Sequence, residues 1–170
     1  MSASFQKVAL VTGAARGIGL AVARHFLAEG WCAALLDIER ELLRESLSAL
    51  GSPDRTLGLV CDVADESAVT EVFAGLERRF GRLDALINNA GVAVFAPLME
   101  TSNAEWRRVL EVNLTGAFLC TKAAVPLMRE RGGAIVNITS ISAVRILAVD
   151  GGFEAAGIGL PTLRGKRRNR

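Results

Sequence analysis

The stretch that decides the fold reads KVALVTGAARGIG and covers residues 7–19. It begins as a short apolar run, which is typical of a buried strand, and then passes into a turn rich in glycine. Beyond the turn, Ile18, Val22 and Phe26 recur every four residues, which predicts a helix that ends near Gly30. A strand that leads through such a turn into a helix predicts a sheet covered by helices.

The same alternation of strand and helix continues to residue 140. The strand segments are continuous apolar runs, which is typical of a parallel sheet covered on both faces. Helices between them predict βαβ units with right-handed crossovers. We expect strands at 7–12, 32–37, 56–63, 84–91 and 133–140, and further helices at 39–50, 66–80 and about 103–130.

Length and composition indicate one globular domain with a substantial core. The chain has 170 residues, of which 51% are hydrophobic and 22% are charged, and this balance excludes a disordered protein. Five of the 20 basic residues follow Leu163 with no acid among them, so residues 1–163 carry 15 basic and 18 acidic side chains and a net charge of −3. The body is therefore mildly acidic and the tail is basic. The basic residues of the tail are Arg164, Lys166, Arg167, Arg168 and Arg170.

Neither the beginning of the chain nor its cysteines indicate export or a membrane. The apolar run before Gly13 is about five residues long, which is shorter than the core of a signal peptide. No stretch approaches the roughly 20 apolar residues of a membrane span. Cys32, Cys61 and Cys120 are odd in number and widely spaced, which favours buried thiols over a disulfide or zinc framework. We expect a cytoplasmic protein without a metal site.

The glycine turn is suited to hold a phosphate group. Gly13 permits a tight turn, and Gly17 and Gly19 permit the backbone to approach a ligand and the first strand to pack closely. The helix that follows directs unpaired N–H groups and a partial positive charge at the turn, which favours a pyrophosphate. The alternative is a plain strand-to-helix turn, but the strand before it and the helix after it favour phosphate binding.

Asp37 ends the second predicted strand, 18 residues after Gly19. An acidic residue at this place accepts hydrogen bonds from an adenosine ribose and repels a 2′-phosphate, which favours NAD over NADP as the cofactor. Arg16 beside the turn favours the opposite preference, because a nearby arginine can bind that phosphate. The alternative role for Asp37 is a helix cap at the end of the strand.

Over residues 5–160 the chain resembles the classical short-chain dehydrogenase/reductase family. TGAARGIG matches the glycine motif of that family, and further motifs follow in the family's order. These are CDV at 61–63, NNAG at 88–91, Asn113 within EVNLTGAF, and NITSIS at 137–142.

The resemblance implies an α/β fold with a Rossmann-type doubly wound parallel sheet in the strand order 3-2-1-4-5. Residues 1–160 would form the dinucleotide-binding domain, and residues 161–170 a basic tail without a family counterpart. Family members continue with two more strands, so this sheet would be incomplete at its C-terminal edge, with the fifth strand exposed. The abrupt basic tail indicates a reading-frame change or an early stop, and hence a truncated or altered family member.

The resemblance also implies a set of site residues. Asp62 would bind adenine through its side chain and Val63 through its backbone. Asn113 would help to hold the water of a proton relay, and Ser140 would be the catalytic serine. The implied cofactor site consists of Gly13, Arg16, Gly17, Ile18, Gly19, Asp37, Asp62, Val63, Asn89, Ala90 and Gly91.

Two positions depart from the family. It has a tyrosine thirteen residues beyond the serine and a lysine four residues further on, where this chain has Phe153 and Gly157. In the family that tyrosine is the general acid/base for alcohol–ketone interconversion, and the lysine lowers its pKa and binds the nicotinamide ribose. Phenylalanine has no ionisable proton, and general acid/base catalysis contributes roughly 10²–10⁴ in rate. We therefore expect an NAD-dependent oxidoreductase by descent whose turnover is impaired.

Other functions stay open. The chain could be a non-catalytic NAD-binding module or a truncated fragment, and nucleic-acid binding by the basic tail is not expected because such a run is usually a solvated end. The resemblance implies a small alcohol or ketone as substrate, no membrane partner, and a homo-oligomer formed through helices near 103–130 and from 152 onward. Phe95, Met99 and Trp106 could line a site, but core packing or a subunit contact is the favoured interpretation.

Overall fold

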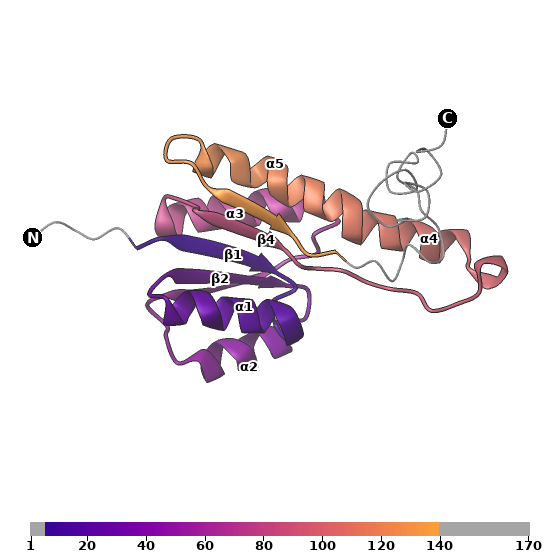
Figure 1. Cartoon of the computed structure of the whole chain (residues 1–170), viewed down its shortest axis with the longest axis horizontal. Coiled ribbons are helices and arrows are strands. Elements are labelled where there is room, and N and C mark those ends of the chain that lie inside the picture. The colour runs from indigo at the N-terminus through magenta and orange to yellow at the C-terminus, as the bar shows by residue number, and fades with distance from the viewer. Residues whose placement is uncertain (1–5, 140–170) are drawn as a thin grey trace, which may run out of the picture. The chain divides into compact units, whose positions relative to one another are not determined.

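The computed structural model describes residues 6–139, and the ranges 1–5 and 140–170 lie outside this part of the chain. Five strands form one parallel sheet in the order β3-β2-β1-β4-β5, which confirms the predicted fold and strand order (Figure 1). The predictions for Ser140, Phe153, Gly157 and the tail fall outside the described residues. The strands are β1 (Val8–Thr12), β2 (Cys32–Asp37), β3 (Thr56–Val60), β4 (Ala85–Asn88) and β5 (Ala134–Asn137).

Helices cover both faces of this sheet. Successive β1 side chains point to opposite faces, so Val8 and Leu10 pack toward α3 and α5, whereas Ala9 and Val11 pack toward α1 and α2. The sheet is therefore a middle layer between two helical layers, as Figure 1 shows. The helical elements are α1 (Gly17–Ala28), α2 (Arg40–Leu50), α3 (Glu66–Phe80), the short η1 (Leu98–Glu100), α4 (Asn103–Leu110), the π-helical η2 (Glu111–Thr115) and α5 (Gly116–Met128).

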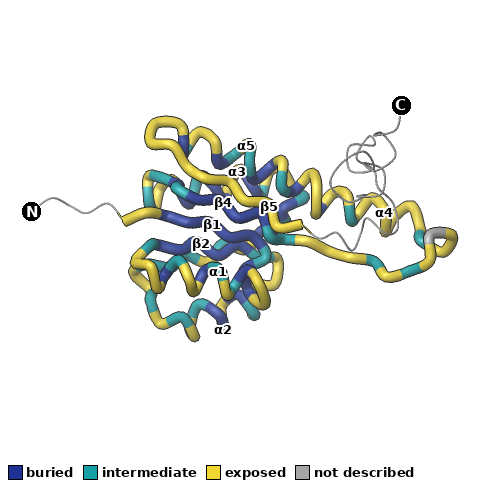
Figure 2. Tube along the Cα trace, viewed as in Figure 1, coloured by how far each residue is buried: buried dark blue, intermediate teal, exposed yellow. Residues whose placement is uncertain are grey.

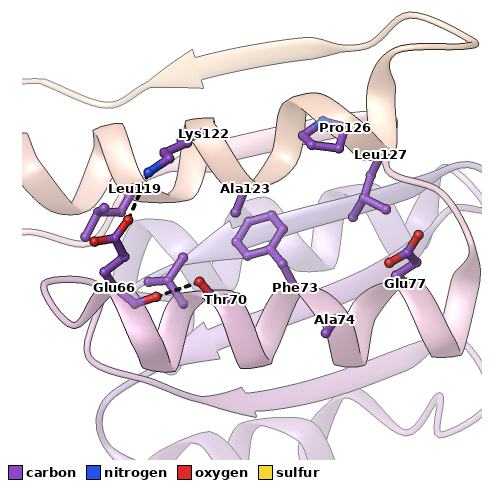
Figure 3. A pocket seen from close by; sticks show the side chains of 11 residues that line it. Glu66, Thr70, Phe73, Ala74, Glu77, Leu119, Lys122, Ala123, Pro126 and Leu127 are labelled. Carbon is purple, nitrogen blue, oxygen red and sulfur yellow. Dashed lines mark hydrogen bonds and ion pairs between the residues drawn. The ribbon is translucent and has the colours of Figure 1, made fainter.

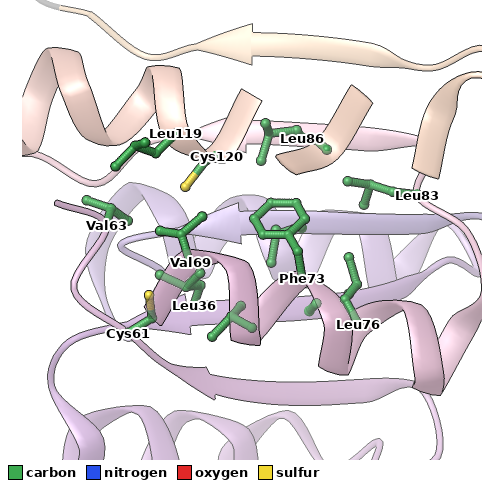
Figure 4. Packing of buried hydrophobic residues seen from close by; sticks show 14 of the residues in the cluster. Leu36, Cys61, Val63, Val69, Phe73, Leu76, Leu83, Leu86, Leu119 and Cys120 are labelled. Atoms are coloured by element: carbon green, nitrogen blue, oxygen red, sulfur yellow. The ribbon is translucent and has the colours of Figure 1, made fainter. Parts of the chain in front are cut away.

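The larger of the two cores among residues 6–139 lies between the sheet and helices α3 and α5 (Figure 4). Phe73 and Leu76 of α3 and Cys120 of α5 are among its buried side chains, together with Leu86 of β4. Full burial of a side chain of this size contributes roughly 1.5–3 kcal/mol. This layer therefore holds α5, and with it η2, in a defined position against the sheet.

Burial decreases toward both edges of the sheet. β1, β2 and β4 are buried apart from the partly exposed Asp37, but β3 ends at Val60 and is only partly buried, and all four residues of β5 are exposed (Figure 2). An edge strand has a neighbouring strand on one side only, so a continuous apolar sequence does not ensure burial there. The prediction of strands covered on both faces was therefore wrong for β3, whereas the exposure of β5 agrees with the prediction that the fifth strand is an exposed edge.

The most buried face of α1 is not the one that carries Ile18, Val22 and Phe26. Ile18 is 62% exposed, and the residues that face the sheet are Gly19, Ala23 and Leu27. The small side chains at 19 and 23 permit α1 to approach the sheet closely, which the larger side chains one position earlier would prevent. This rotation leaves Ile18 at the open end of the helix, beside the glycine turn.

The helix predicted at about 103–130 is continuous from Asn103 to Met128, but its winding changes in the middle. Between α4 and α5 the backbone widens into η2, where the Gly116 N–H donates to the Glu111 carbonyl, five residues back. Asn113 lies at the centre of this segment. Single π-helical turns often occur at functional sites, and this turn explains the presence of a poor helix former in the middle of a long helical segment.

The three cysteines are free and buried, as predicted. Burial raises the pKa of the Cys61 thiol to about 11 and that of the Cys120 thiol to about 12. Among residues 6–139 no helix is long and apolar enough to cross a membrane, and no cluster of three or more His, Cys, Asp or Glu side chains is placed to hold a metal ion.

Candidate dinucleotide site

The turn between β1 and α1 depends on its glycines for two different reasons. Gly13 and Gly17 have φ values of +62° and +55°, a conformation that side chains with a Cβ disfavour. Gly19 lies within α1, but a Cβ on it would lie 2.3 Å from the Gly13 carbonyl oxygen. The first two glycines thus shape the turn, and the third permits the helix to pack directly on it.

Asn89 and Thr12 hold the turn against the end of β4. The Asn89 Nδ2 group donates to the carbonyl oxygens of Thr12 at 2.9 Å and Gly13 at 3.1 Å. In return, the Thr12 Oγ1 accepts from the backbone N–H groups of Asn89 and Ala90, both at 2.9 Å. The predicted residues Gly13, Asn89 and Ala90 are therefore in one network. Thr12 was missed, although a threonine directly before the first glycine is visible in the sequence.

The beginning of α1 fits a pyrophosphate. Arg16 occupies the N-cap position with an extended backbone and makes no side-chain cap hydrogen bond, and the first turn of the helix contains no acidic residue. The first N–H groups of a helix lack partners within it and carry a partial positive charge. Gly17 and Ile18, which supply such groups, are exposed. An anionic diphosphate could therefore approach this backbone without displacing a side chain.

Asp37 lies at the end of β2, beside the glycine turn. Its Oδ2 accepts from the Ala15 N–H at 2.9 Å, and its Oδ1 accepts from the Glu39 N–H at 3.1 Å. Ser46 supports the same place, because its hydroxyl donates to the Ala15 carbonyl at 2.6 Å. A carboxylate offers about four acceptor sites, so two remain for the hydroxyls of a ribose. The contact with Glu39 is a local one to the N-cap residue of α2, and this helix has no side-chain cap hydrogen bond.

Asp62 and Val63 follow β3 and contact the helix opposite. The Asp62 Oδ1 accepts from the Ala64 N–H at 2.9 Å, and its Oδ2 accepts from the Arg108 guanidinium at 3.1 Å. Val63 is buried, and a Cβ added at Gly116 would lie 2.7 Å from its Cγ2. Its side chain therefore belongs to the packing between layers. Arg108 had no role in the prediction, and no local pattern connects it with a residue 46 positions earlier.

Asn113 joins η2 to the segment that leaves β4. Its Oδ1 accepts from the Val92 N–H at 2.8 Å, and its Nδ2 donates to the Val92 carbonyl at 2.9 Å. The Asn113 Oδ1 would also lie 3.4 Å from a Cβ at Gly91, which is ordinary van der Waals distance and shows that the two residues are adjacent. The structure thus brings together Gly91 and Asn113 from two predicted motifs. Ser140, the other residue for which the resemblance implies a catalytic role, lies outside the described residues.

Two other features do not contribute to this site. Phe95 and Met99 are 95% and 93% exposed, so core packing is wrong for both. A hollow of about 390 Å³ lies between α3 and α5, where Figure 3 shows Phe73 and Lys122 from the two helices. None of its lining residues belongs to the predicted site. They are Glu66, Val69, Thr70, Phe73, Ala74, Glu77, Leu119, Lys122, Ala123, Pro126 and Leu127.

Comparison with known proteins agrees with this geometry. The family model described as short chain dehydrogenase matches residues 7–162. The chain belongs to the short-chain dehydrogenase family. Members of this family bind a nicotinamide dinucleotide, for which the glycine turn, Asp37 and the beginning of α1 provide a fitting surface. The location of this surface, at the carboxyl ends of parallel strands, is where ligands bind in open α/β sheets.

Individual relatives share the same half of the family fold. The D-threitol dehydrogenase of Mycolicibacterium smegmatis is 44% identical over 140 residues, which cover 81% of this chain and 54% of the relative. The NADP-dependent (R)-specific alcohol dehydrogenase of Lentilactobacillus kefiri is 35% identical over 137 residues, 79% of this chain and 54% of the relative. An NAD+-bound xylitol dehydrogenase structure superposes with a TM-score of 0.77 at 40% identity, covering 84% of this chain and 56% of the other. The chain thus spans about half the length of these dehydrogenases.

Proposed function

We propose that this chain binds NAD(H) in preference to NADP(H), and that it descends from an enzyme that interconverts a small alcohol and a ketone. The observation that carries the proposal is the meeting of Asp37, the glycine turn and the open beginning of α1 at one edge of the sheet. Asp37 is already held by the N–H groups of Ala15 and Glu39. Its carboxylate would repel the 2′-phosphate of NADP(H), whereas it can accept hydrogen bonds from the hydroxyls of NAD(H).

We further propose that turnover is impaired. Phe153 and Gly157 stand where the family has its tyrosine and lysine, and neither can transfer a proton or lower the pKa of a neighbour. Loss of general acid/base catalysis costs roughly 10²–10⁴ in rate. The same two residues favour the second candidate function, a non-catalytic module that uses the dinucleotide as a ligand.

Titration of the full chain with NADH, followed by nicotinamide fluorescence, tests the binding proposal. We expect saturable binding that is tighter than that of NADPH. Asp37→Ala should weaken NADH binding by about tenfold to a hundredfold, since hydrogen bonds to a charged group are among the stronger ones. Glu41→Gln is the matched control, because it removes an exposed carboxylate of the nearby α2 that pairs only locally with Arg44. Equal affinity of the wild-type chain for both cofactors would remove the proposed role of Asp37.

Turnover separates the two candidate functions. With a panel of small secondary alcohols, the wild-type chain should show little or no NAD+ reduction. The double variant Phe153→Tyr with Gly157→Lys should gain activity if the rest of the catalytic machinery is competent. Ordinary turnover by the unaltered chain would contradict the proposed impairment.

Self-association is a further proposal. Leu114, Phe118 and Val125 are exposed along η2 and α5, with exposed fractions of 66%, 60% and 42%. Apolar side chains that gather on one helix are typical of protein interfaces. We expect a homo-oligomer by light scattering, and we expect Phe118→Glu to shift the chain toward the monomer.

A further inference from the structure

The ion pair between Arg108 and Asp62 links two segments that lie 46 residues apart in the sequence. The Arg108 guanidinium lies 3.1 Å from the Asp62 Oδ2, and the two side chains are 45% and 31% exposed. Arg108 is in the last turn of α4, whose beginning is set by a capping box between Ser102 and Glu105. The cation is therefore presented by a helix that is fixed at its start.

Each oxygen of the Asp62 carboxylate has one donor. Oδ1 accepts from the Ala64 N–H at 2.9 Å, and Oδ2 accepts from Arg108. The terminal torsion of an aspartate is broad, so a single contact leaves the plane of the carboxylate free to rotate. Two contacts on different oxygens define that plane, and each oxygen keeps one further acceptor site.

The loop that carries Asp62 is also held by packing. Val63 lies so close to Gly116 that a Cβ on that glycine would be 2.7 Å from the valine Cγ2. Gly116 begins α5, eight residues beyond Arg108 along the same helical segment. One continuous helical segment thus holds this loop through an ion pair at residue 62 and through van der Waals contact at residue 63.

We propose that Arg108 is a positioning residue for adenine recognition: it orients the Asp62 carboxylate so that its remaining acceptor sites receive the exocyclic amino group of the base. This inference rests on the proposed function, because it requires a dinucleotide to bind along this edge of the sheet. It also specifies the base that the site selects. A carboxylate attracts the amino group of adenine but repels the carbonyl oxygen that hypoxanthine presents at the same place.

The test compares NADH with nicotinamide hypoxanthine dinucleotide in its reduced form, in which a carbonyl oxygen replaces that amino group and the adjacent ring nitrogen carries a hydrogen. Wild-type protein should bind NADH more tightly. Arg108→Ala and Arg108→Gln should each reduce this preference by about threefold to fivefold, the upper range for an ion pair between partly exposed side chains. The loss should fall on NADH, with the affinity for the hypoxanthine analogue nearly unchanged. Arg108→Lys, which keeps the cation, should recover part of the preference.

Lys122→Ala is the matched control. It breaks another exposed ion pair, which joins α5 to α3 and in which the Lys122 Nζ lies 2.9 Å from the Glu66 Oε1, as drawn in Figure 3. This variant should keep the wild-type preference, so a change in preference specific to position 108 cannot come from loosened packing alone. Circular dichroism identifies a variant that does not fold. If Arg108→Ala does not fold, the preference of Arg108→Gln decides the test.

The outcomes separate this inference from the proposed function. If wild-type protein binds neither reduced dinucleotide, both fall together. If wild-type protein binds NADH but shows no preference over the hypoxanthine analogue, or if both neutral variants keep the preference within twofold, only the role of Arg108 is refuted.

Discussion

The substitution Gly19→Ala tests whether the glycine turn is held by direct packing against its own helix. A Cβ at position 19 would lie 2.3 Å from the Gly13 carbonyl oxygen and 2.6 Å from the Asn89 Nδ2. Real Cβ atoms do not approach other heavy atoms this closely, and the nearer atom belongs to the backbone. Either the glycine turn or the first helical turn of α1 must therefore move. This movement weakens the hydrogen bonds from Asn89 to Thr12 and Gly13.

The expected loss in the free energy of unfolding is about 3 kcal/mol. Overpacking of a tight site costs about 1–3 kcal/mol, and two weakened hydrogen bonds add about 1 kcal/mol each. Alanine recovers about 0.5–1 kcal/mol of this loss, because it is the better helix former and loses less backbone entropy on folding. The unfavourable contributions exceed the favourable one by a wide margin.

Gly75→Ala is the matched control, because Gly75 is also a helical glycine. It lies inside α3, where an added Cβ would have only the Arg78 guanidinium nearby, at 3.7 Å. This variant should gain about 0.5–1 kcal/mol from helix propensity alone. The same chemical change thus has opposite signs in two helices of one protein, and the sign depends only on what surrounds the position.

Urea unfolding measures both variants, with far-ultraviolet circular dichroism for the helices and fluorescence for the two tryptophans. Coincident transitions by the two probes would justify a two-state free energy. The reasoning would be refuted if Gly19→Ala were as stable as the wild-type protein, or more stable. We also expect Gly19→Ala to lose saturable NADH binding, whereas Gly75→Ala should keep it.

Two further predictions concern titrating groups. Asp65 caps α3, and hydrogen bonds from the Ser67 hydroxyl and the Ala68 N–H lower the pKa of its carboxyl from the usual 3.8. The stability that the ionised carboxyl contributes is therefore complete above pH 3.8. It is lost as the pH falls through the lower pKa of the folded state. Asp65→Asn should flatten the dependence of the urea midpoint on pH below 4, and an unchanged dependence would contradict the cap. Burial raises the pKa of the Cys61 thiol to about 11 and of the Cys120 thiol to about 12, so a thiol reagent at pH 8 should label neither in the folded protein and both in urea. Rapid labelling of Cys120 before unfolding would show that the α5 core is open.

Much of the fold could be predicted because its signals are local. Apolar runs that alternate with helical periods gave the strands and helices, and Gly51 and Gly81 end α2 and α3 in the left-handed conformation. The glycine turn was recognisable because a strand precedes it and a helix follows. The strand order, by contrast, came from the family resemblance, since periodicity does not state which strands are neighbours.

The errors arose where burial depends on lateral neighbours. The apolar run of β3 is continuous, yet β3 is only partly buried because its outer side has no strand beside it among the described residues. The exposure of β5, at the opposite edge, was expected from the predicted strand order. In α1 the most hydrophobic stripe contains Ile18, but close approach to the sheet selected the stripe of Gly19 and Ala23. Side-chain volume mattered more than hydrophobicity at that contact.

The sequence by itself determined the alternation of strands and helices, the position of the glycine turn and the carboxylate at the end of β2. These follow from preferences that act within a few residues. Only the tertiary structure decided that Asn89 holds the turn, that Asn113 binds the backbone of Val92, and that Arg108 reaches Asp62. Those contacts join segments 21 to 77 residues apart. They arise because a parallel sheet brings the ends of distant strands together at one edge. Side chains that meet there are not related by any local sequence pattern.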